Sequence, residues 1–122
     1  MKYILENPAK KEIVVYQIDN GLIKNKDLKC DFGLYTENDY LYLIELKSPE
    51  REYGHALQQI ISTIDILIKS KNISVSKLHA RIVLKKDPSI TNAKERKLEN
   101  AIIKNYHCNL LHGTKILTEI LQ

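Results

Sequence analysis

The chain has 122 residues, of which 43% are hydrophobic, and its 19 basic and 15 acidic residues give a formal net charge of +4. This length predicts a single domain, residues 1–122, with its own core. No apolar run reaches the about 18 residues of a membrane-spanning helix, and no signal-peptide pattern is present. We therefore expect a cytoplasmic protein with no membrane partner, and its mild basicity is compatible with a polyanionic ligand.

The first half of the chain is predicted to be mostly β-structure. Residues 12–18 are rich in β-branched side chains, which favour a strand, and Asp-Asn-Gly at 19–21 is a turn signal. Residues 22–28 are irregular or form a short strand. Residues 30–35 and 40–47 read as the two strands of a hairpin.

A long helix is predicted over residues 50–69. Ser48 is a candidate N-cap, and Pro49 would occupy the first helical position. Apolar residues at helical spacing form a stripe that must cover a sheet: Leu57, Ile60, Ile61, Ile64 and Ile68.

The second half alternates strands and helices. Residues 78–86 read as a strand, and residues 92–106 as a helix that Asn92 and Glu95 would begin with a capping box. A short strand at 108–111 and a final helix at 115–121 follow. This order predicts an α/β domain with a layered core, in which helices flank a central mixed β-sheet.

The hairpin brings three charged residues together. Its turn-forming residues surround Asn38, and a hairpin centred there places Asp31 directly opposite Glu45. Side chains alternate along a strand, so Glu45 and Lys47 then share a face with Asp31. Facing Cβ atoms lie about 5 Å apart, close enough for two carboxylates to share one ion. A shift of one residue in register would move Asp31 to the other face.

This group has the chemistry of a metal site. Asp31 and Glu45 would ligate Mg²⁺ or Mn²⁺, hard ions that prefer oxygen, and the backbone carbonyl of Leu46 would supply a third oxygen. A bound ion lowers the pKa of a water and neutralises charge on a phosphate. Lys47 would orient that water or stabilise the transition state. The alternative is a surface salt bridge on an edge hairpin.

Three segments resemble the restriction-endonuclease-like, PD-(D/E)xK nuclease superfamily: Cys-Asp-Phe at 30–32, Ile-Glu-Leu-Lys at 44–47 and His-Ala-Leu-Gln-Gln-Ile at 55–60. In that superfamily an acid begins the second core strand, an acid-x-Lys triplet ends the third, and a helix with a frequent glutamine follows. Two features depart from the pattern. Cys30 stands where a proline is usual, and the segment before residue 12 is short for the opening helix with its extra glutamate.

The resemblance implies a restriction-endonuclease-like core and Mg²⁺- or Mn²⁺-dependent hydrolysis of DNA phosphodiester bonds, of a prokaryotic defence or DNA-repair type. Asp31, Glu45, Lys47 and Gln59 become the catalytic residues, and the first two hold the metal. Small basic members act as dimers, so a homodimer or a partner protein is expected. The alternative function is a non-catalytic immunity, assembly or nucleic-acid-binding module that retains the nuclease fold.

Four further residues are candidate DNA contacts. His55 lies one helical turn before Gln59 and would contact a phosphate or a water. Tyr53 would stack on a base, and Lys85 and Lys86 would contact the phosphate backbone. The alternatives are a solvated face for His55 and the lysines, and core packing for Tyr53.

Overall fold

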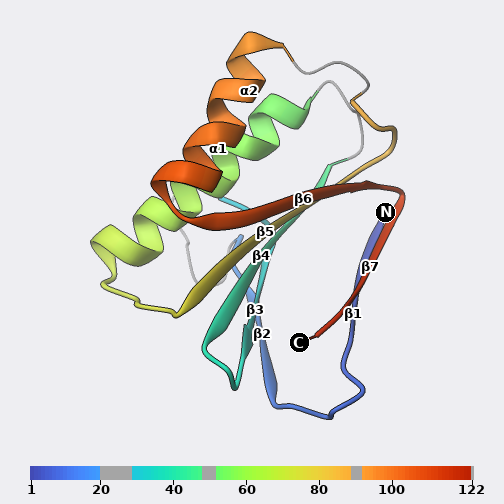
Figure 1. Cartoon of the computed structure of the whole chain (residues 1–122), viewed down its shortest axis with the longest axis vertical. Coiled ribbons are helices and arrows are strands. Elements are labelled where there is room, and N and C mark those ends of the chain that lie inside the picture. Colours follow the sequence, from blue (N-terminus) through green and yellow to red (C-terminus); the bar gives the residue numbers. More distant parts are fainter. Residues whose placement is uncertain (20–28, 48–51, 89–91, 122) are drawn as a thin grey trace.

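The computed structural model describes residues 1–19, 29–47, 52–88 and 92–121. Within them a five-stranded mixed sheet is accompanied by a two-stranded sheet and two helices (Figure 1). The strands are β1 (Lys2–Glu6), β2 (Ile13–Gln17), β3 (Phe32–Thr36), β4 (Tyr40–Lys47), β5 (Lys77–Leu84), β6 (Cys108–Thr114) and β7 (Ile116–Ile120). The helices are α1 (Tyr53–Ile64) and α2 (Ala93–Asn100), which continue into the π-helical segments η2 (Asp65–Ser70) and η3 (Ala101–Asn105).

The large sheet has the strand order β2-β3-β4-β5-β6. The pairs β2–β3 and β3–β4 are antiparallel, whereas β4–β5 and β5–β6 are parallel. Each parallel pair is joined through a helix, as a crossover connection requires. The predicted α/β architecture with a central mixed sheet is confirmed.

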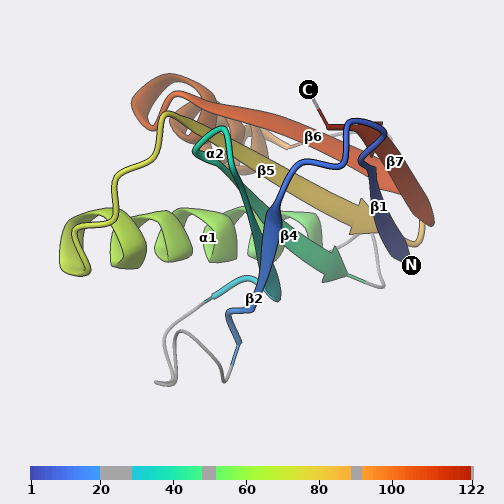
Figure 2. The same ribbon diagram turned by 90° about the horizontal axis from the view of Figure 1, so that it is seen from below.

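Both helices pack on one face of this sheet. Leu57 and Ile60 of α1 and Ile102 of η3 join Leu43 of β4 and Ile82 of β5 in one core, and all five are fully buried. The predicted stripe of α1 is confirmed at its centre, where Leu57, Ile60 and Ile64 are buried. The view in Figure 2 shows α1 running alongside the strands that it covers.

The opposite face is covered by strands. The β1 and β7 strands pair in parallel, so that the first and last strands of the chain lie side by side (Figures 1 and 2). Tyr3 and Leu5 of β1 pack against Tyr42 and Ile44 of β4. The layer on this side is therefore a two-stranded sheet rather than a helix.

The helix predicted over residues 115–121 is wrong. Its residues form β7, in which Leu117 and Glu119 are partly buried while Ile116 and Ile120 are exposed. This period of two suits a strand with one covered face. The partner of β7 is β1, which was not predicted as a strand. The hydrogen bonds that stabilise β7 are therefore made with residues at the other end of the sequence.

Other predicted elements stand close to their expected places. Strand β2 and the β3–β4 hairpin are confirmed, and β6 extends beyond the predicted strand to Thr114. The Asn92–Glu95 capping box is confirmed, with the Glu95 N–H donating to Asn92 Oδ1 at 2.8 Å and the Asn92 N–H donating to Glu95 Oε1 at 3.0 Å. The predicted cap at Ser48 and Pro49 and the segment 20–28 lie outside the described residues.

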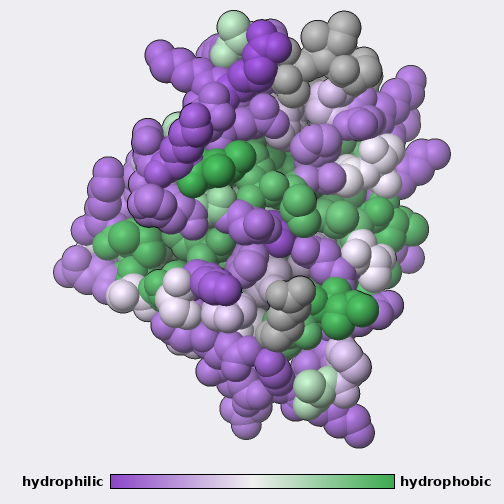
Figure 3. All heavy atoms as spheres, in the orientation of Figure 1, coloured by the Kyte–Doolittle hydropathy of each residue, from purple (hydrophilic) through white to green (hydrophobic). Residues whose placement is uncertain are grey.

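Apolar side chains also reach the surface. Figure 3 shows them as a band across the face viewed in Figure 1, bordered by polar residues. Exposed large hydrophobic residues occur on β1, β2, β6, β7 and η3, and Val15 is the most exposed of them at 64%. In the part of the chain that the structure describes, no helix is long and apolar enough to cross a membrane.

Candidate metal and phosphate site

Asp31 and Glu45 meet at the end of the β3–β4 hairpin. Phe32 pairs with Ile44 in the predicted register, and the Asp31 N–H donates to the Ile44 carbonyl at 3.1 Å. The Asp31 side chain turns towards β4, where its Oδ2 accepts a hydrogen bond of 2.9 Å from the Leu46 N–H. The hairpin therefore holds Asp31 against the strand that carries Glu45.

Glu45 is the fully buried carboxyl group of the site. Its exposure is 0%, and its neighbours are the Asp31 carboxyl group and the Lys47 ammonium at 3.6 Å, with no donor of ordinary hydrogen-bond length to either oxygen among the described residues. Burial raises the pKa of Glu45 to about 9, and a proton shared with Asp31 and the charge of Asp31 add to the shift. Lys47 lowers this pKa only in part. The pKa of Glu45 is therefore set mainly by the cost of burying a charged carboxylate.

Lys47 provides the positive charge of the site. Its Nζ lies 3.6 Å from Glu45 Oε2 and 3.8 Å from Glu52 Oε2, the latter at the start of α1. The Lys47 side chain is 20% exposed and that of Glu52 is 43% exposed. The ammonium group therefore stands between a buried carboxylate and solvent, and Glu52 is a neighbour that the sequence pattern did not identify.

The backbone of Leu46 faces Asp31. The N–H and C=O groups of one strand residue point to the same side, and the N–H of Leu46 is bound by the Asp31 side chain. The Leu46 carbonyl oxygen consequently lies on the side of β4 that faces Asp31. The Asp31 carboxylate and the Leu46 backbone are therefore neighbours at this end of the hairpin.

Gln59 is connected to this site through the segment that leads into Asp31. Its Nε2 donates to the Lys29 carbonyl at 3.0 Å, and its buried Oε1 has no partner among the described residues. Thr63, one turn later, accepts the Cys30 N–H at 2.9 Å and donates to the Gln59 carbonyl at 2.7 Å. Helix α1 therefore fixes residues 29 and 30, and with them the start of the hairpin.

Cys30 occupies the position before Asp31 as a core residue. It is fully buried, and burial raises the pKa of its thiol to about 12. A thiol with such a pKa is not a nucleophile at neutral pH. Its N–H, which a proline would lack, bonds Thr63, so the cysteine ties the hairpin to α1.

The structure places the four predicted DNA-contact residues in different surroundings. Lys85 and Lys86 are exposed and directly follow Leu84, the β5 residue that pairs with Lys47. His55 is exposed near the start of α1. Tyr53 is fully buried, donates its hydroxyl hydrogen to Glu99 and packs its ring edge-on against His112. This leaves no open ring face for a base, because the first turn of α1 uses Tyr53 as a core residue.

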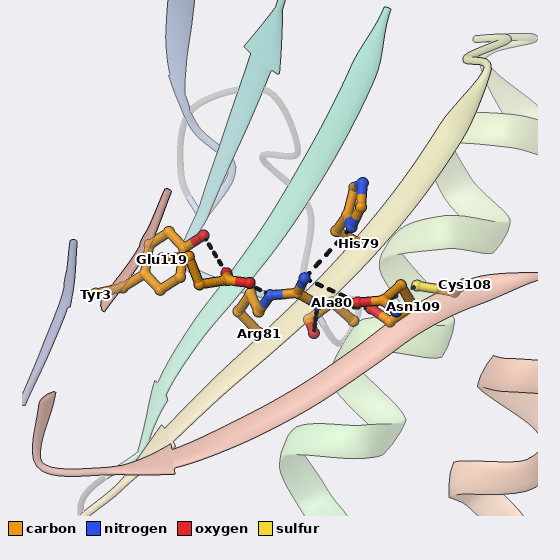
Figure 4. Close-up of polar contacts among 7 residues, drawn as sticks. All are labelled: Tyr3, His79, Ala80, Arg81, Cys108, Asn109 and Glu119. Carbon is orange, nitrogen blue, oxygen red and sulfur yellow. Dashed lines mark hydrogen bonds and ion pairs between the residues drawn. The ribbon is translucent and has the colours of Figure 1, made fainter. Parts of the chain in front are cut away.

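A second buried polar cluster lies on the other face of the sheet (Figure 4). Arg81 of β5 is 3% exposed and lies between Glu119 and Asn109. Its Nε donates to Glu119 Oε2 at 2.6 Å, and its terminal nitrogens reach the carbonyl oxygens of Ala80 and Asn109, the Asn109 side chain and the His79 ring. Tyr3 donates to the same Glu119 oxygen at 2.6 Å.

Every guanidinium nitrogen of Arg81 is thus used. Burial alone would raise the pKa of Glu119, but the hydrogen bonds from Arg81 and Tyr3 outweigh it and hold the pKa below its usual value. The ion pair attaches β7 to the sheet and has no donor left for a ligand. The sequence offered one indication of this ion pair, an arginine within the apolar strand sequence His-Ala-Arg-Ile-Val-Leu. An arginine buried in such a strand requires an acidic partner.

Among residues 1–19, 29–47, 52–88 and 92–121, no group of three or more His, Cys, Asp or Glu side chains is arranged to hold a metal. A metal at the Asp31–Glu45 pair would depend on two carboxylates, a carbonyl and water. No family model, curated protein or solved structure matches the chain.

Proposed function

We propose that this protein is a metal-dependent nuclease that hydrolyses phosphodiester bonds in DNA, with a restriction-endonuclease-like core. The observation that carries the proposal is Glu45, a fully buried carboxyl group that lies beside the Asp31 carboxyl group and 3.6 Å from the Lys47 ammonium and has no donor of ordinary hydrogen-bond length among the described residues. Buried polar groups are nearly always hydrogen-bonded. A buried carboxyl group with no donor of ordinary hydrogen-bond length is expected where a ligand completes its contacts.

The donor set suits Mg²⁺ or Mn²⁺. Both ions prefer oxygen, and a site with few protein ligands that keeps several waters is usual for Mg²⁺. Asp31, Glu45 and the Leu46 carbonyl would hold the ion. When bound, it supplies a lowered pKa for water and neutralises charge on a phosphate.

Lys47 would work beside this pair as an orienting group. Its Nζ has room between Glu45 and Glu52 and remains partly exposed. Because its Nζ lies beside two acidic side chains, its role would be hydrogen-bond donation to the attacking water or to a phosphate oxygen. Gln59 and Thr63 would hold the segment before Asp31 in place through Lys29 and Cys30.

The DNA backbone would reach this site across the exposed lysines at the end of β5. Lys85 and Lys86 follow Leu84, the register partner of Lys47, so they lie beyond the same end of the sheet as Lys47. Such contacts position a duplex without reading its sequence. Tyr53 has no part in this interface.

The test is a cleavage assay on plasmid, linear and branched DNA, and on RNA, with and without Mg²⁺ or Mn²⁺. We expect metal-dependent cutting by the native chain and a loss of about 100-fold or more in Glu45→Ala and Lys47→Ala, as for the removal of a group that stabilises transition-state charge. Glu6→Ala and Lys2→Ala, both exposed on β1, are matched controls that should retain activity.

Cutting that survives both site substitutions would contradict the assignment of the site. Absence of cutting, together with no heat of Mg²⁺ or Mn²⁺ binding in calorimetry, would contradict the enzyme and leave the non-catalytic binding module. RNA cleavage without DNA cleavage would reassign the substrate.

A further inference from the structure

The corner between β6 and β7 holds a lysine in a backbone conformation that favours glycine. Lys115 has a φ of 62°, in the left-handed region, which is uncommon for residues other than glycine, asparagine, aspartate and histidine. Its side chain is exposed, so burial does not explain the choice of lysine. Strained residues of this kind cluster where a side chain has a function.

Two residues earlier the chain does use glycine, and there the reason is space. A Cβ atom on Gly113 would lie 3.0 Å from Leu117 Cβ and 3.1 Å from Leu117 Cδ1, so a larger residue would disturb the packing of β7. At position 115 the reason for glycine would be conformational, and a lysine stands there instead. Lys115→Gly is therefore expected to fit the fold at least as well as the native lysine does.

Backbone hydrogen bonds place Lys115 beside the lysines at the end of β5. The Lys115 N–H donates to the Leu84 carbonyl at 2.7 Å, and Leu84 directly precedes Lys85 and Lys86. On its other side Leu84 pairs with Lys47 of β4. Lys47 and the three exposed lysines therefore lie at one end of the sheet, where the parallel strands β4, β5 and β6 all reach their carboxyl ends.

The charge of these exposed lysines is not neutralised by ion pairs. Lys85, Lys86 and Lys115 form no ion pair within the part of the chain that the structure describes. Asp87, which follows Lys86, brings one negative charge to this end of the sheet, and its Oδ1 lies 3.5 Å from His112 Nδ1. The lysines outnumber this acid, and the resulting positive surface attracts a polyanion.

We propose that Lys115 binds the phosphate backbone of duplex DNA beside the candidate site, an inference that rests on the proposed nuclease function. Neighbouring strands are about 4.8 Å apart, so β6 lies about 10 Å from β4 in the sheet. That distance is the rise of about three nucleotides at about 3.4 Å each. A DNA strand whose scissile phosphate lies at the Asp31–Glu45 pair therefore reaches Lys115 with a phosphate a few nucleotides away.

This contact gives the bound DNA a direction. Its backbone crosses the carboxyl ends of β4, β5 and β6 in that order, and a contact of this kind positions a duplex without reading its sequence. The Lys2 side chain is not part of the contact, although the Lys2 N–H donates to the Lys115 carbonyl at 2.8 Å. Tyr3 and Leu5 face the large sheet, and Lys2 alternates with them on the outer face of β1.

Lys10 provides a matched control for Lys115. Among the described residues it is the other lysine in the left-handed region, with a φ of 53°, and it is also exposed. It precedes β2 at the end of the sheet where Ile13 pairs with Thr36, opposite the end that holds Lys115 (Figure 1). Lys10→Gly and Lys115→Gly each remove one charge and one left-handed lysine, so both variants should keep the native midpoint of urea unfolding or raise it.

Fluorescence anisotropy of a labelled DNA duplex, in metal-free buffer at several salt concentrations, measures the binding of the full chain. At about 50 mM salt, Lys115→Gly should raise the Kd about tenfold, and the slope of log K against log salt should fall in magnitude by about 0.9, the value for one phosphate contact. Lys10→Gly should leave both quantities unchanged. In the cleavage assay, Lys115→Gly should raise the KM for DNA and leave kcat within about twofold, because a positioning contact is kept throughout the reaction.

A native chain without affinity for the duplex would overturn the proposal, and so would native-like binding by Lys115→Gly. An equal loss of affinity in Lys10→Gly and Lys115→Gly would also overturn it, because net charge rather than position would then decide binding. Failure of the nuclease proposal has a different signature. Binding that depends on Lys115, without metal-dependent cutting, would support the contact and contradict the enzyme.

Discussion

Two buried polar clusters lie on opposite faces of the same sheet and differ in how their polar atoms are satisfied. In the Arg81–Glu119 cluster, the guanidinium nitrogens are all bonded, and Tyr3 bonds the carboxylate that Arg81 also bonds. In the Asp31–Glu45 pair, the Glu45 carboxyl group is more deeply buried than that of Glu119, but its cation, Lys47, lies 3.6 Å away and no donor of ordinary hydrogen-bond length reaches it among the described residues. A saturated cluster stabilises the fold, whereas an unsaturated one costs stability until a ligand completes it.

The largest expected effect comes from breaking the saturated cluster. Arg81→Met should lower the free energy of unfolding by about 3–5 kcal/mol, because it leaves the Glu119 carboxylate buried without its cation. Urea unfolding followed by circular dichroism measures this change. Lys77→Met on the same strand, at an exposed position, is the control. A cost for Arg81→Met no greater than that for Lys77→Met would show that the ion pair does not attach β7.

A double variant sharpens the same point. Arg81→Met combined with Glu119→Leu removes both charges and should recover most of the lost stability, because buried ion pairs can be replaced by apolar side chains of similar volume. Failure to recover would assign the loss to packing instead of to the unpaired carboxylate.

A substitution in the Asp31–Glu45 pair should change the free energy of unfolding in the opposite direction. In metal-free buffer at alkaline pH, Glu45→Gln is expected to raise the free energy of unfolding by about 1–3 kcal/mol, because an amide needs no proton to stay neutral. Since the pKa of Glu45 is raised from 4.5 to about 9, the folded native chain retains a proton that the unfolded chain releases. Native stability should therefore fall as pH rises through this window.

Urea unfolding at several pH values tests this prediction, with the exposed Glu6→Gln as control. Mg²⁺ should stabilise the native chain and leave Glu45→Gln nearly unchanged. A destabilised Glu45→Gln variant in metal-free buffer would mean that the carboxyl group already has a partner and is structural.

A smaller, pH-dependent effect is expected from His79, which contacts Arg81 and whose buried Nε2 has no partner among the described residues. Burial and then the Arg81 charge lower the pKa of His79 below 6.5, while Asn109 and Glu119 act against this and Lys77 adds to it. The folded state therefore holds a neutral ring, and stability should be lost as pH falls below 6.5 because only the unfolded chain gains the proton. His79→Asn should flatten this slope in urea titrations, and the exposed His107→Asn should not. An unchanged slope in His79→Asn would contradict the assignment.

The smallest effect is expected from Tyr3→Phe. It removes one hydrogen bond of 2.6 Å to Glu119 but leaves Arg81 in place, so the cost should be about 1 kcal/mol. Thermal or urea unfolding measures it, with Tyr40→Phe, a tyrosine packed against the same face, as control. A cost as large as that of Arg81→Met would mean that Tyr3 rather than Arg81 holds β7.

Local pattern was sufficient for the hairpin and the helix that follows it. The turn residues around Asn38 determine the register of β3 and β4, so Asp31 could be placed beside Glu45 by counting, and the Asn92 capping box could be read from two letters three residues apart. These features depend on neighbours in sequence, where geometry is nearly fixed by turn length and helical period.

The sequence by itself thus predicted the register of the β3–β4 hairpin and the α/β order of the large sheet. Only the tertiary structure decided that residues 116–120 form a strand, since their partner lies at the other end of the chain. It also decided that Tyr53 is buried, that Gln59 holds the Lys29 carbonyl, and that Arg81 pairs with Glu119 across 38 positions. The physical reason is the same in each case. Long-range packing and charge pairing depend on which segments the fold brings together, and the local periodicity of the sequence does not contain that information.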